Sequence, residues 1–172
     1  ELGFVLSKVL VRDLSKTRAG IDKAHLTTNP SEIIDASDIL VEVMGGMTLA
    51  TETMLSALQC GKRVVTANKA ALAEQWQTFK PYIQKGLLYF EDSVMAGTPT
   101  IGALTGVLRG SRPLELHAIL NGTCNYILSE IEKGVPYAKA LKEAQTLGYA
   151  EADPKLDVEG FYDKMEDVMS PN

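Results

Sequence analysis

The sequence is poor in cysteine and has no long apolar run and no basic block. Its two cysteines, Cys60 and Cys124, are far apart and lack a CxxC spacing, so we expect reduced thiols rather than disulfides or a cysteine metal site. No apolar run approaches the roughly 20 residues of a membrane span. Acids and bases are mixed around a net charge of −5, which argues against nucleic acid as a partner. We therefore expect a cytoplasmic protein without nucleic-acid or membrane partners.

The glycine-rich turn that usually cradles a dinucleotide is also missing. No GxGxxG occurs, so the expected ring of backbone amides around a pyrophosphate has no counterpart in the sequence. The first residue is Glu1 rather than methionine, and no basic leader precedes an apolar core. We expect an upstream segment to be missing, and we expect no signal peptide.

The first half of the chain alternates strand and helix patterns. Apolar runs predict strands, and a period of 3.6 residues predicts helices, one of them short and opened by Asn29-Pro30-Ser31 with Ser31 as its cap. The expected strands are residues 4–11, 38–44, 63–66 and 87–90, and the longer helices are 49–60 and 70–82. This alternation predicts a parallel sheet with crossover helices. Ligands bind at the carboxyl ends of such strands, where Arg12, the Gly45–Gly46 pair and residues 66–69 stand.

The second half has a different, α+β pattern from about residue 98 onward. The predicted elements are a helix at 99–108, an alternating strand at 114–120, a helix at about 125–132, and a helix that begins near Pro136 and ends at Gly148. The last helix carries an apolar stripe of Tyr137, Ala140, Leu141, Ala144 and Leu147. The fold class predicted for the whole chain is α/β, with a parallel sheet followed by a second, α+β domain.

Four segments carry side chains or backbone suited to chemistry, and each also has a plain structural interpretation. Lys69 could hold a phosphate or carboxylate, or be a solvated lysine before a helix. Gly45 and Gly46 could admit a ligand to the backbone, or form a tight turn. Carbonyls of residues 91–98 could bind a hard cation, or form a domain junction. The acids of residues 151–159 could bind an ammonium group or move a proton, or form an acidic surface loop.

Three motifs resemble those of the homoserine dehydrogenase family. Residues 121–128 (NGTCNYIL) resemble its NGTxNYIL segment, and residues 148–160 (GYAEADPKLDVEG) resemble its GYAEADPxxDVEG signature. Residues 66–69 (TANK) match its TxNK turn. The order and spacing agree over a region from about residue 4 to residue 160. The chain is therefore similar to this family along most of its length.

The resemblance implies a partial Rossmann-like NAD(P)-binding domain at residues 1–97 and part of a substrate-binding, catalytic and dimerisation domain at residues 98–172. It implies reversible conversion between L-homoserine and L-aspartate 4-semialdehyde, the step shared by threonine, methionine and isoleucine biosynthesis. It also implies a homo-oligomer, NADP or NAD as cofactor, and a monovalent cation such as sodium. Arg12 favours NADP without deciding between the two cofactors.

The resemblance also assigns roles to individual residues. Lys69 corresponds to a lysine near the nicotinamide and substrate, Gly45 and Gly46 to cofactor-lining positions, and Arg12 to a contact with an NADP phosphate. Glu151 and Asp157 correspond to acids that hold homoserine. The loop that binds sodium, mainly through carbonyls, maps to Glu91, Val94, Ala96 and Thr98.

The family pattern is broken after Gly160. Tyr162 and Glu166 stand where the family has an aspartate and a lysine. Asp163 and Lys164 are nearby, but shifts of one or two residues turn a helical side chain by about 100° or 200°. Lys164 is the first candidate to replace the missing lysine. Three hypotheses follow: an NAD(P)-dependent oxidoreductase of this family, a non-catalytic binding or assembly module of the same family, or a different dehydrogenase with a related two-domain plan. The motifs at residues 121–128 and 148–160 argue against the third.

Overall fold

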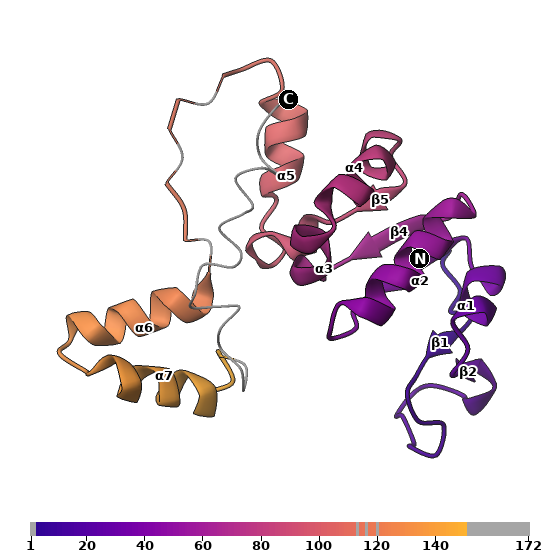
Figure 1. Cartoon of the computed structure of the whole chain (residues 1–172), viewed down its shortest axis with the longest axis horizontal. Coiled ribbons are helices and arrows are strands. Elements are labelled where there is room, and N and C mark those ends of the chain that lie inside the picture. The colour runs from indigo at the N-terminus through magenta and orange to yellow at the C-terminus, as the bar shows by residue number, and fades with distance from the viewer. Residues whose placement is uncertain (1–2, 113, 116, 120, 151–172) are drawn as a thin grey trace. The chain divides into compact units, whose positions relative to one another are not determined.

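The computed structural model describes residues 3–112, 114–115, 117–119 and 121–150 (Figure 1). The chain divides into two compact units, Glu1–Phe90 and Glu91–Asn172, and each is described by itself. The first unit holds the strands of the described chain, and the second holds turns and helices.

The first unit contains two parallel sheets. Strands β3 (Ile39–Glu42), β4 (Arg63–Thr66) and β5 (Leu88–Tyr89) form one sheet in that order, and β1 (Val9–Leu10) pairs with β2 (Leu26–Thr27) in the other. The prediction of a parallel sheet built from alternating strands and helices is therefore confirmed. Strand β2 and the short η1 turn before it (Lys23–His25) were not expected from the sequence.

Helix α2 (Thr48–Gln59) covers part of the larger sheet and follows the predicted apolar stripe. Ala50, Met54, Ala57 and Leu58 are all buried, and α2 contacts both β3 and β4. The helix ends before Gly61, whose φ of +74° lies in the left-handed region that glycine adopts without strain. Burial of this stripe against the sheet makes α2 and β4 the centre of the first core.

Three predictions for the first unit are corrected. The strand predicted at residues 4–11 is reduced to β1, because β2 offers only two residues for pairing. Val5, in the part that is not a strand, is 86% exposed. The helix at 70–82 is two helices, α3 (Lys69–Glu74) and α4 (Trp76–Gln84), separated at Gln75. After this break, the Trp76 ring meets the Phe90 ring edge-on at 5.8 Å.

The third correction concerns the cap of α1 (Pro30–Ala36). Asn29, not Ser31, is the N-cap, because its side-chain oxygen accepts a hydrogen bond from the Ser31 backbone N–H at 3.1 Å. The Ser31 hydroxyl donates to the same oxygen at 2.9 Å. Asn before proline at the first helical position is a common helix start.

The second unit begins with two 3-10 turns and continues with helices. The turns are η2 (Glu91–Ser93) and η3 (Met95–Gly97), and the helices are α5 (Thr100–Gly102), the π-helical η4 (Ala103–Val107), α6 (Gly122–Glu132) and α7 (Tyr137–Thr146). Helices α6 and α7 pack side by side around Ile127, Ala140, Ala144 and Ala150 (Figure 1). Gly148 follows α7 with a φ of +76°, so the predicted end of this helix is confirmed.

The strand expected at 114–120 is wrong for the residues of this segment that the structure describes. Positions 114, 115 and 117–119 are not in a strand, and Leu114 is 93% exposed. The exposed side chains of Glu115 and His117 approach to 2.8 Å within the segment. The alternating pattern has no neighbouring strand in the described part of this unit, and an unpaired strand leaves its backbone groups without ladder partners. Nowhere in the described ranges is a helix both long and apolar enough to cross a bilayer.

Candidate functional site

The carboxyl edge of the β3–β4–β5 sheet carries three of the predicted site residues. Gly45 and Gly46 follow β3, and Lys69 follows β4 as the first residue of α3. Gly46 has a φ of +89°, and a Cβ added at either glycine would meet no atom within 4 Å. The backbone of this turn therefore faces open space, and a ligand can approach it closely.

A closed ring of hydrogen bonds joins the loop after β3 to the turn after β4. We use the name edge ring for four residues together: Glu42, Met44, Thr66 and Asn68. The Glu42 carboxylate accepts from the Thr66 hydroxyl at 2.6 Å and from the Met44 backbone N–H at 2.7 Å. The Asn68 N–H donates to the Thr66 hydroxyl oxygen at 3.0 Å, and the Asn68 amide Nδ2 donates to the Met44 carbonyl at 3.3 Å. The ring is closed because Met44, in the loop after β3, is bonded to both Glu42 and Asn68.

Glu42 is the buried anchor of the edge ring. Its side chain is only 2% exposed, although it is an acid on an apolar strand. Burying a carboxylate without hydrogen-bond donors would be strongly unfavourable, and here each of its two oxygens accepts one donor. The carboxylate is therefore satisfied by the two segments that it joins, which fixes their separation.

Asn68 connects the edge ring to both neighbouring site elements. Its Nδ2 donates a second hydrogen bond to the Gly46 carbonyl at 2.9 Å, and its Oδ1 accepts from the Ala71 N–H at 3.0 Å as the N-cap of α3. One carboxamide therefore holds the glycine turn and the start of the helix on which Lys69 stands. Lys69 itself is exposed at the surface of this edge.

Arg12 lies at the carboxyl end of a different sheet. It follows Val11, whose N–H donates to the Thr27 carbonyl at 2.8 Å and so extends the β1–β2 pairing. Its side chain is exposed. Beyond it, hydrogen bonds from the Ser15 hydroxyl and N–H, and the charge of Arg18, hold the pKa of Asp13 below its ordinary value. The structure brings Gly45, Gly46 and Lys69 to one edge and places Arg12 on a separate pair of strands.

The expected cation loop is a compact pair of turns. The Glu91 side chain accepts hydrogen bonds from the Ile101 N–H at 2.9 Å and the Gly102 N–H at 2.8 Å, so it caps the start of α5. Val94 is buried, Ala96 lies in η3, and the Thr98 N–H donates to the Met95 carbonyl at 3.1 Å. The Glu91 carboxylate is thus engaged with the start of α5. The described residues contain no group of three or more His, Cys, Asp or Glu side chains arranged for a metal.

Glu151, Asp157 and Lys164 lie outside the described residues, and the structure describes the segment that leads to Glu151. The buried Thr123 hydroxyl donates to the Tyr149 carbonyl, and the Tyr126 and Tyr149 rings meet edge-on at 5.2 Å. The NGT motif of α6 therefore contacts the start of the GYAEADP motif directly. Partial burial, followed by the charges of Glu143 and Glu130, raises the pKa of Tyr126 above its ordinary value.

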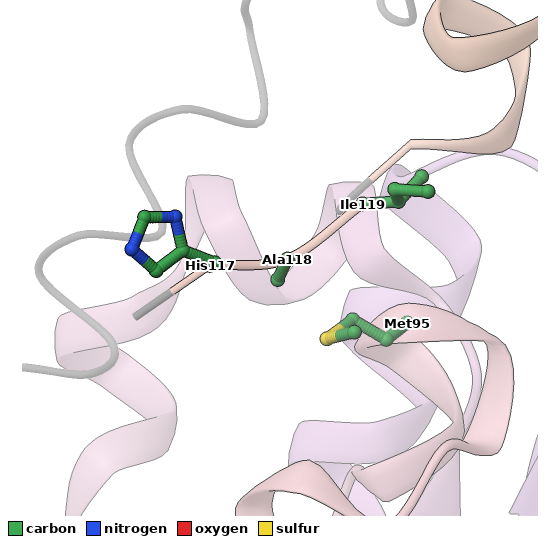
Figure 2. Close-up of a pocket in the computed structure, with 4 residues that line it drawn as sticks. All are labelled: Met95, His117, Ala118 and Ile119. Carbon is green, nitrogen blue, oxygen red and sulfur yellow. The ribbon is translucent and has the colours of Figure 1, made fainter. Parts of the chain in front are cut away.

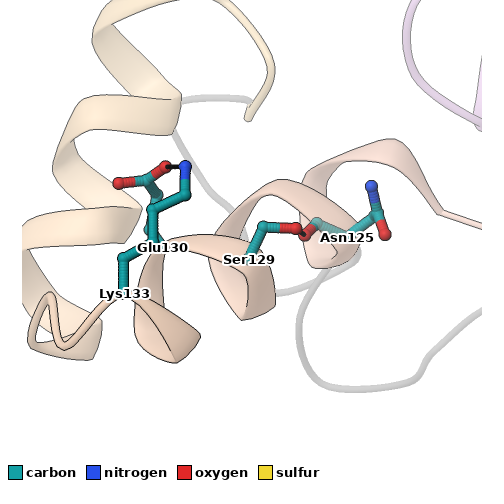
Figure 3. A network of polar contacts seen from close by, with 4 residues as sticks. All are labelled: Asn125, Ser129, Glu130 and Lys133. Carbon is teal, nitrogen blue, oxygen red and sulfur yellow. Dashed lines mark hydrogen bonds and ion pairs between the residues drawn. The ribbon is translucent and has the colours of Figure 1, made fainter.

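Polar contacts along α6 stabilise the helix that carries the NGT motif. Asn121 caps α6 by accepting from the Cys124 N–H at 3.0 Å, and the Ser129 hydroxyl donates to the Asn125 carbonyl at 2.8 Å (Figure 3). Lys133 pairs with Glu130 at 2.6 Å near the other end of the helix (Figure 3). These contacts are local to α6.

A separate, open pocket in the second unit contains few side chains that could take part in catalysis. Met95, His117, Ala118 and Ile119 line it (Figure 2). His117 is the only one of these four residues with a polar side chain, and its Nε2 lies 2.8 Å from the carboxylate of exposed Glu115. The Met95 sulfur accepts a hydrogen bond from the Thr100 hydroxyl at 3.3 Å. This pocket therefore offers an apolar contact surface rather than a set of reacting groups.

The sequence interpretation missed the edge ring, although two signals in the sequence indicate it. Glu42 is an acid inside the apolar run 38–44, and a buried acid requires hydrogen-bond donors. Asn68 stands directly before a helical pattern, which is typical of an N-cap. Neither signal identifies the partner, because the Asn68 contacts to Met44 and Gly46 cross 24 and 22 residues.

Comparison with known proteins gives the same family for both parts of the chain. Residues 1–81 match the family profile "Homoserine dehydrogenase, NAD binding domain", and residues 99–166 match the profile "Homoserine dehydrogenase". The homoserine dehydrogenase of Neisseria gonorrhoeae is 44% identical over 155 residues, which cover 86% of this chain and 36% of the relative. That of Bacillus subtilis is 40% identical over 162 residues, which cover 91% of this chain and 37% of the relative. The chain thus spans little more than a third of the length of these curated relatives.

Solved structures with similar folds agree with this result. A homoserine dehydrogenase from Thiobacillus denitrificans superposes with a TM-score of 0.73 at 44% identity, over 83% of this chain and 35% of that one. A hyperthermophilic archaeal homoserine dehydrogenase in complex with NADPH superposes with a TM-score of 0.68 at 32% identity, over 83% of this chain and 47% of that one.

Proposed function

This chain belongs to the homoserine dehydrogenase family, and on that basis we propose that it serves the NAD(P)-dependent interconversion of L-homoserine and L-aspartate 4-semialdehyde. The observation that carries the proposal is the carboxyl edge of the first unit. There the open glycine turn and Lys69 are held together by the edge ring. This edge is where doubly wound sheets bind ligands.

The residues at this edge fit a nicotinamide dinucleotide. Gly45 and Gly46 admit a ligand to within contact of the backbone, and exposed Lys69 supplies a cation for a phosphate, a ribose hydroxyl or a substrate carboxylate. Arg12 is assigned to the additional phosphate of NADP, and the proposal therefore favours NADP over NAD. The related archaeal enzyme that superposes on this chain is an NADPH complex, which supports the same choice.

The substrate side of the proposal rests on the second unit. Glu151 and Asp157 would hold the ammonium group of homoserine, as opposite charges favour each other at short range. A bound nicotinamide would supply the chemistry of hydride transfer. Lys69 would orient the reacting oxygen, and Lys164 would take up the hydroxyl proton as the aldehyde forms and return it in the reverse reaction.

The remaining parts of the proposal concern the cation, the domain roles and the assembly. Carbonyls in the loop of Glu91, Val94, Ala96 and Thr98 would hold sodium, with the Glu91 side chain bracing the loop against α5. Residues 1–97 would bind the cofactor and residues 98–172 the substrate. The proposed assembly is a cytoplasmic homo-oligomer.

A non-catalytic assembly module is the second candidate, and exposed apolar side chains favour it. Val107 is 90% exposed and Leu114 is 93% exposed, both in the second unit. Large apolar side chains in contact with water are typical of surfaces that associate. Under this hypothesis the chain would form an oligomer, by size-exclusion chromatography, without turnover.

The test is NADPH oxidation by L-aspartate 4-semialdehyde, followed by absorbance at high protein concentration with Lys69→Ala as the control. The proposal predicts turnover by the wild-type chain and a loss of at least about tenfold in Lys69→Ala, because a cation at the reacting centre is removed. Folded wild-type protein with no turnover would overturn the catalytic proposal and favour the assembly module. Equal turnover in both proteins would contradict the role of Lys69.

A further inference from the structure

We propose that Asn68 is a positioning residue that fixes the Gly45–Gly46 turn relative to the start of α3, and that it thereby controls NADPH affinity without touching the cofactor. The link to NADPH rests on the proposed function above. The link to the turn rests on the hydrogen bonds of the edge ring alone.

The Asn68 carboxamide forms one hydrogen bond to the loop after β3, one to the glycine turn and one to α3. Its Nδ2 donates to the Met44 carbonyl at 3.3 Å and the Gly46 carbonyl at 2.9 Å, and its Oδ1 accepts from the Ala71 N–H at 3.0 Å. An amide side chain has two N–H donors and one acceptor oxygen, so these contacts use its full donor capacity. No other neutral side chain of this size has that combination.

The turn needs such a brace because little else restrains it. Gly45 and Gly46 are exposed, and added Cβ atoms there would meet nothing within 4 Å. Glycine has the largest backbone freedom of any residue, and a flexible binding turn loses affinity when ligand binding orders it. A hydrogen bond from Asn68 to the Gly46 carbonyl restricts the turn before a ligand arrives.

Glu42 and Thr66 hold Asn68 in position. The Thr66 hydroxyl accepts from the Asn68 backbone N–H at 3.0 Å and donates to the Glu42 carboxylate at 2.6 Å. The same carboxylate accepts from the Met44 N–H at 2.7 Å, on the loop that Asn68 holds by its carbonyl. A closed set of mutually supporting hydrogen bonds has fewer alternative arrangements than an open chain. The position of Asn68 is therefore set by the ends of both strands.

The substitution Asn68→Ser separates the brace from the helix cap. Serine is a good N-cap and keeps an acceptor for the Ala71 N–H, but its shorter side chain has a single O–H donor in place of the two N–H donors that bond Met44 and Gly46. Asn29→Ser is the matched control, since Asn29 caps α1 in the same unit by accepting from the Ser31 N–H. Serine also adds no charge, so electrostatic repulsion of NADPH does not enter the comparison.

Two measurements on the full 172-residue chain test the proposal. Amide hydrogen exchange, followed by NMR, should show the Met44 N–H exchanging at least about fivefold faster in Asn68→Ser, with the Cys60 N–H that follows α2 unchanged. NADPH titration, followed by fluorescence, should show affinity weakened about fivefold to twentyfold in Asn68→Ser and by less than about twofold in Asn29→Ser. Melting temperatures of the two variants should differ little from each other.

Each outcome bears on the proposal. Unchanged Met44 exchange in Asn68→Ser, or NADPH affinity equal to wild type, would overturn it. So would equal losses of affinity and melting temperature in both variants, because that result indicates general destabilisation. If the wild-type chain binds no NADPH, the proposed cofactor role fails, and the exchange of Met44 alone decides whether Asn68 braces the turn.

Discussion

The two units of this chain achieve order in different ways. In the first, strands distant in sequence pair in parallel, and the core contains large side chains such as Met54, Leu58 and Phe79, all nearly inaccessible. In the described part of the second, contacts between neighbouring helices dominate, and three of the four residues that form the α6–α7 cluster are alanines. Long-range strand pairing therefore holds the first unit together, whereas contacts between helices close in sequence hold the described part of the second.

The largest expected difference concerns the first core. Phe79→Ala should lower the free energy of unfolding by about 3–5 kcal/mol, because Phe79 is fully buried and its removal leaves a cavity. Val41→Ala, at an exposed position of β3, should change it by no more than about 0.5 kcal/mol. Urea unfolding measures both. Similar losses in the two variants would contradict the description of the first core.

The stability of the α6–α7 cluster should depend more on an enlarged side chain than on a shortened one, because most of its buried residues are alanines. Ala144→Leu should destabilise the chain by about 1–3 kcal/mol, because Ala144 is fully buried between α6 and α7. Ala138→Leu, at an exposed position of the same helix, is the control, since alanine and leucine have similar helix propensities. Thermal unfolding of the two variants at the same midpoint would contradict close packing of the hairpin.

A smaller effect is expected where the two signature motifs meet. Thr123→Val removes the hydroxyl that donates to the Tyr149 carbonyl and should cost about 0.5–1.5 kcal/mol. Thr123→Ser keeps the hydroxyl and should retain most of that stability. Exchange of the Tyr149 and Ala150 amides by NMR provides a local measurement. The expectation fails if valine and serine give the same exchange rates.

The smallest effect is a shift in titration at Tyr126. Partial burial and the nearby acids Glu143 and Glu130 raise the pKa of this phenol, so the folded chain favours its neutral form. The resulting stability is present below the pKa of an unfolded tyrosine, and it is lost as the pH rises through the folded pKa. Ultraviolet titration should show that Glu143→Gln lowers the pKa of Tyr126 toward its ordinary value. Glu132→Gln, outside this group of charges, should leave it unchanged.

Local patterns predicted helices better than strands. The stripe of α2 and the stops at Gly61 and Gly148 were predicted correctly, because period and glycine conformation are properties of neighbouring residues. The length of β1 was not, since it depends on how many residues β2 offers across the sheet. Residues 114–119 alternate like a strand, but alternation alone does not supply a partner strand.

The same contrast between local patterns and long-range contacts applies to the candidate site. The sequence indicated Gly45, Gly46 and Lys69 through the rule that ligands bind at the carboxyl ends of parallel strands. It did not indicate that Asn68 and Glu42 join the two loops, because those contacts depend on the pairing of β3 with β4. The roles of Gly45, Gly46 and Lys69 stay predictions, as do those of Arg12, Glu91 and the residues after 150.

The most direct test of the central claim is a titration of the isotope-labelled chain with NADPH, followed by backbone NMR. The account predicts that the amide shifts that change most are those of Gly45, Gly46 and Lys69, at the carboxyl edge of the β3–β4–β5 sheet. They should change together with a single affinity, and Lys69→Ala should weaken that affinity. Changes confined to other parts of the chain, or no change at all in folded protein, would contradict the assignment of this edge as the cofactor site.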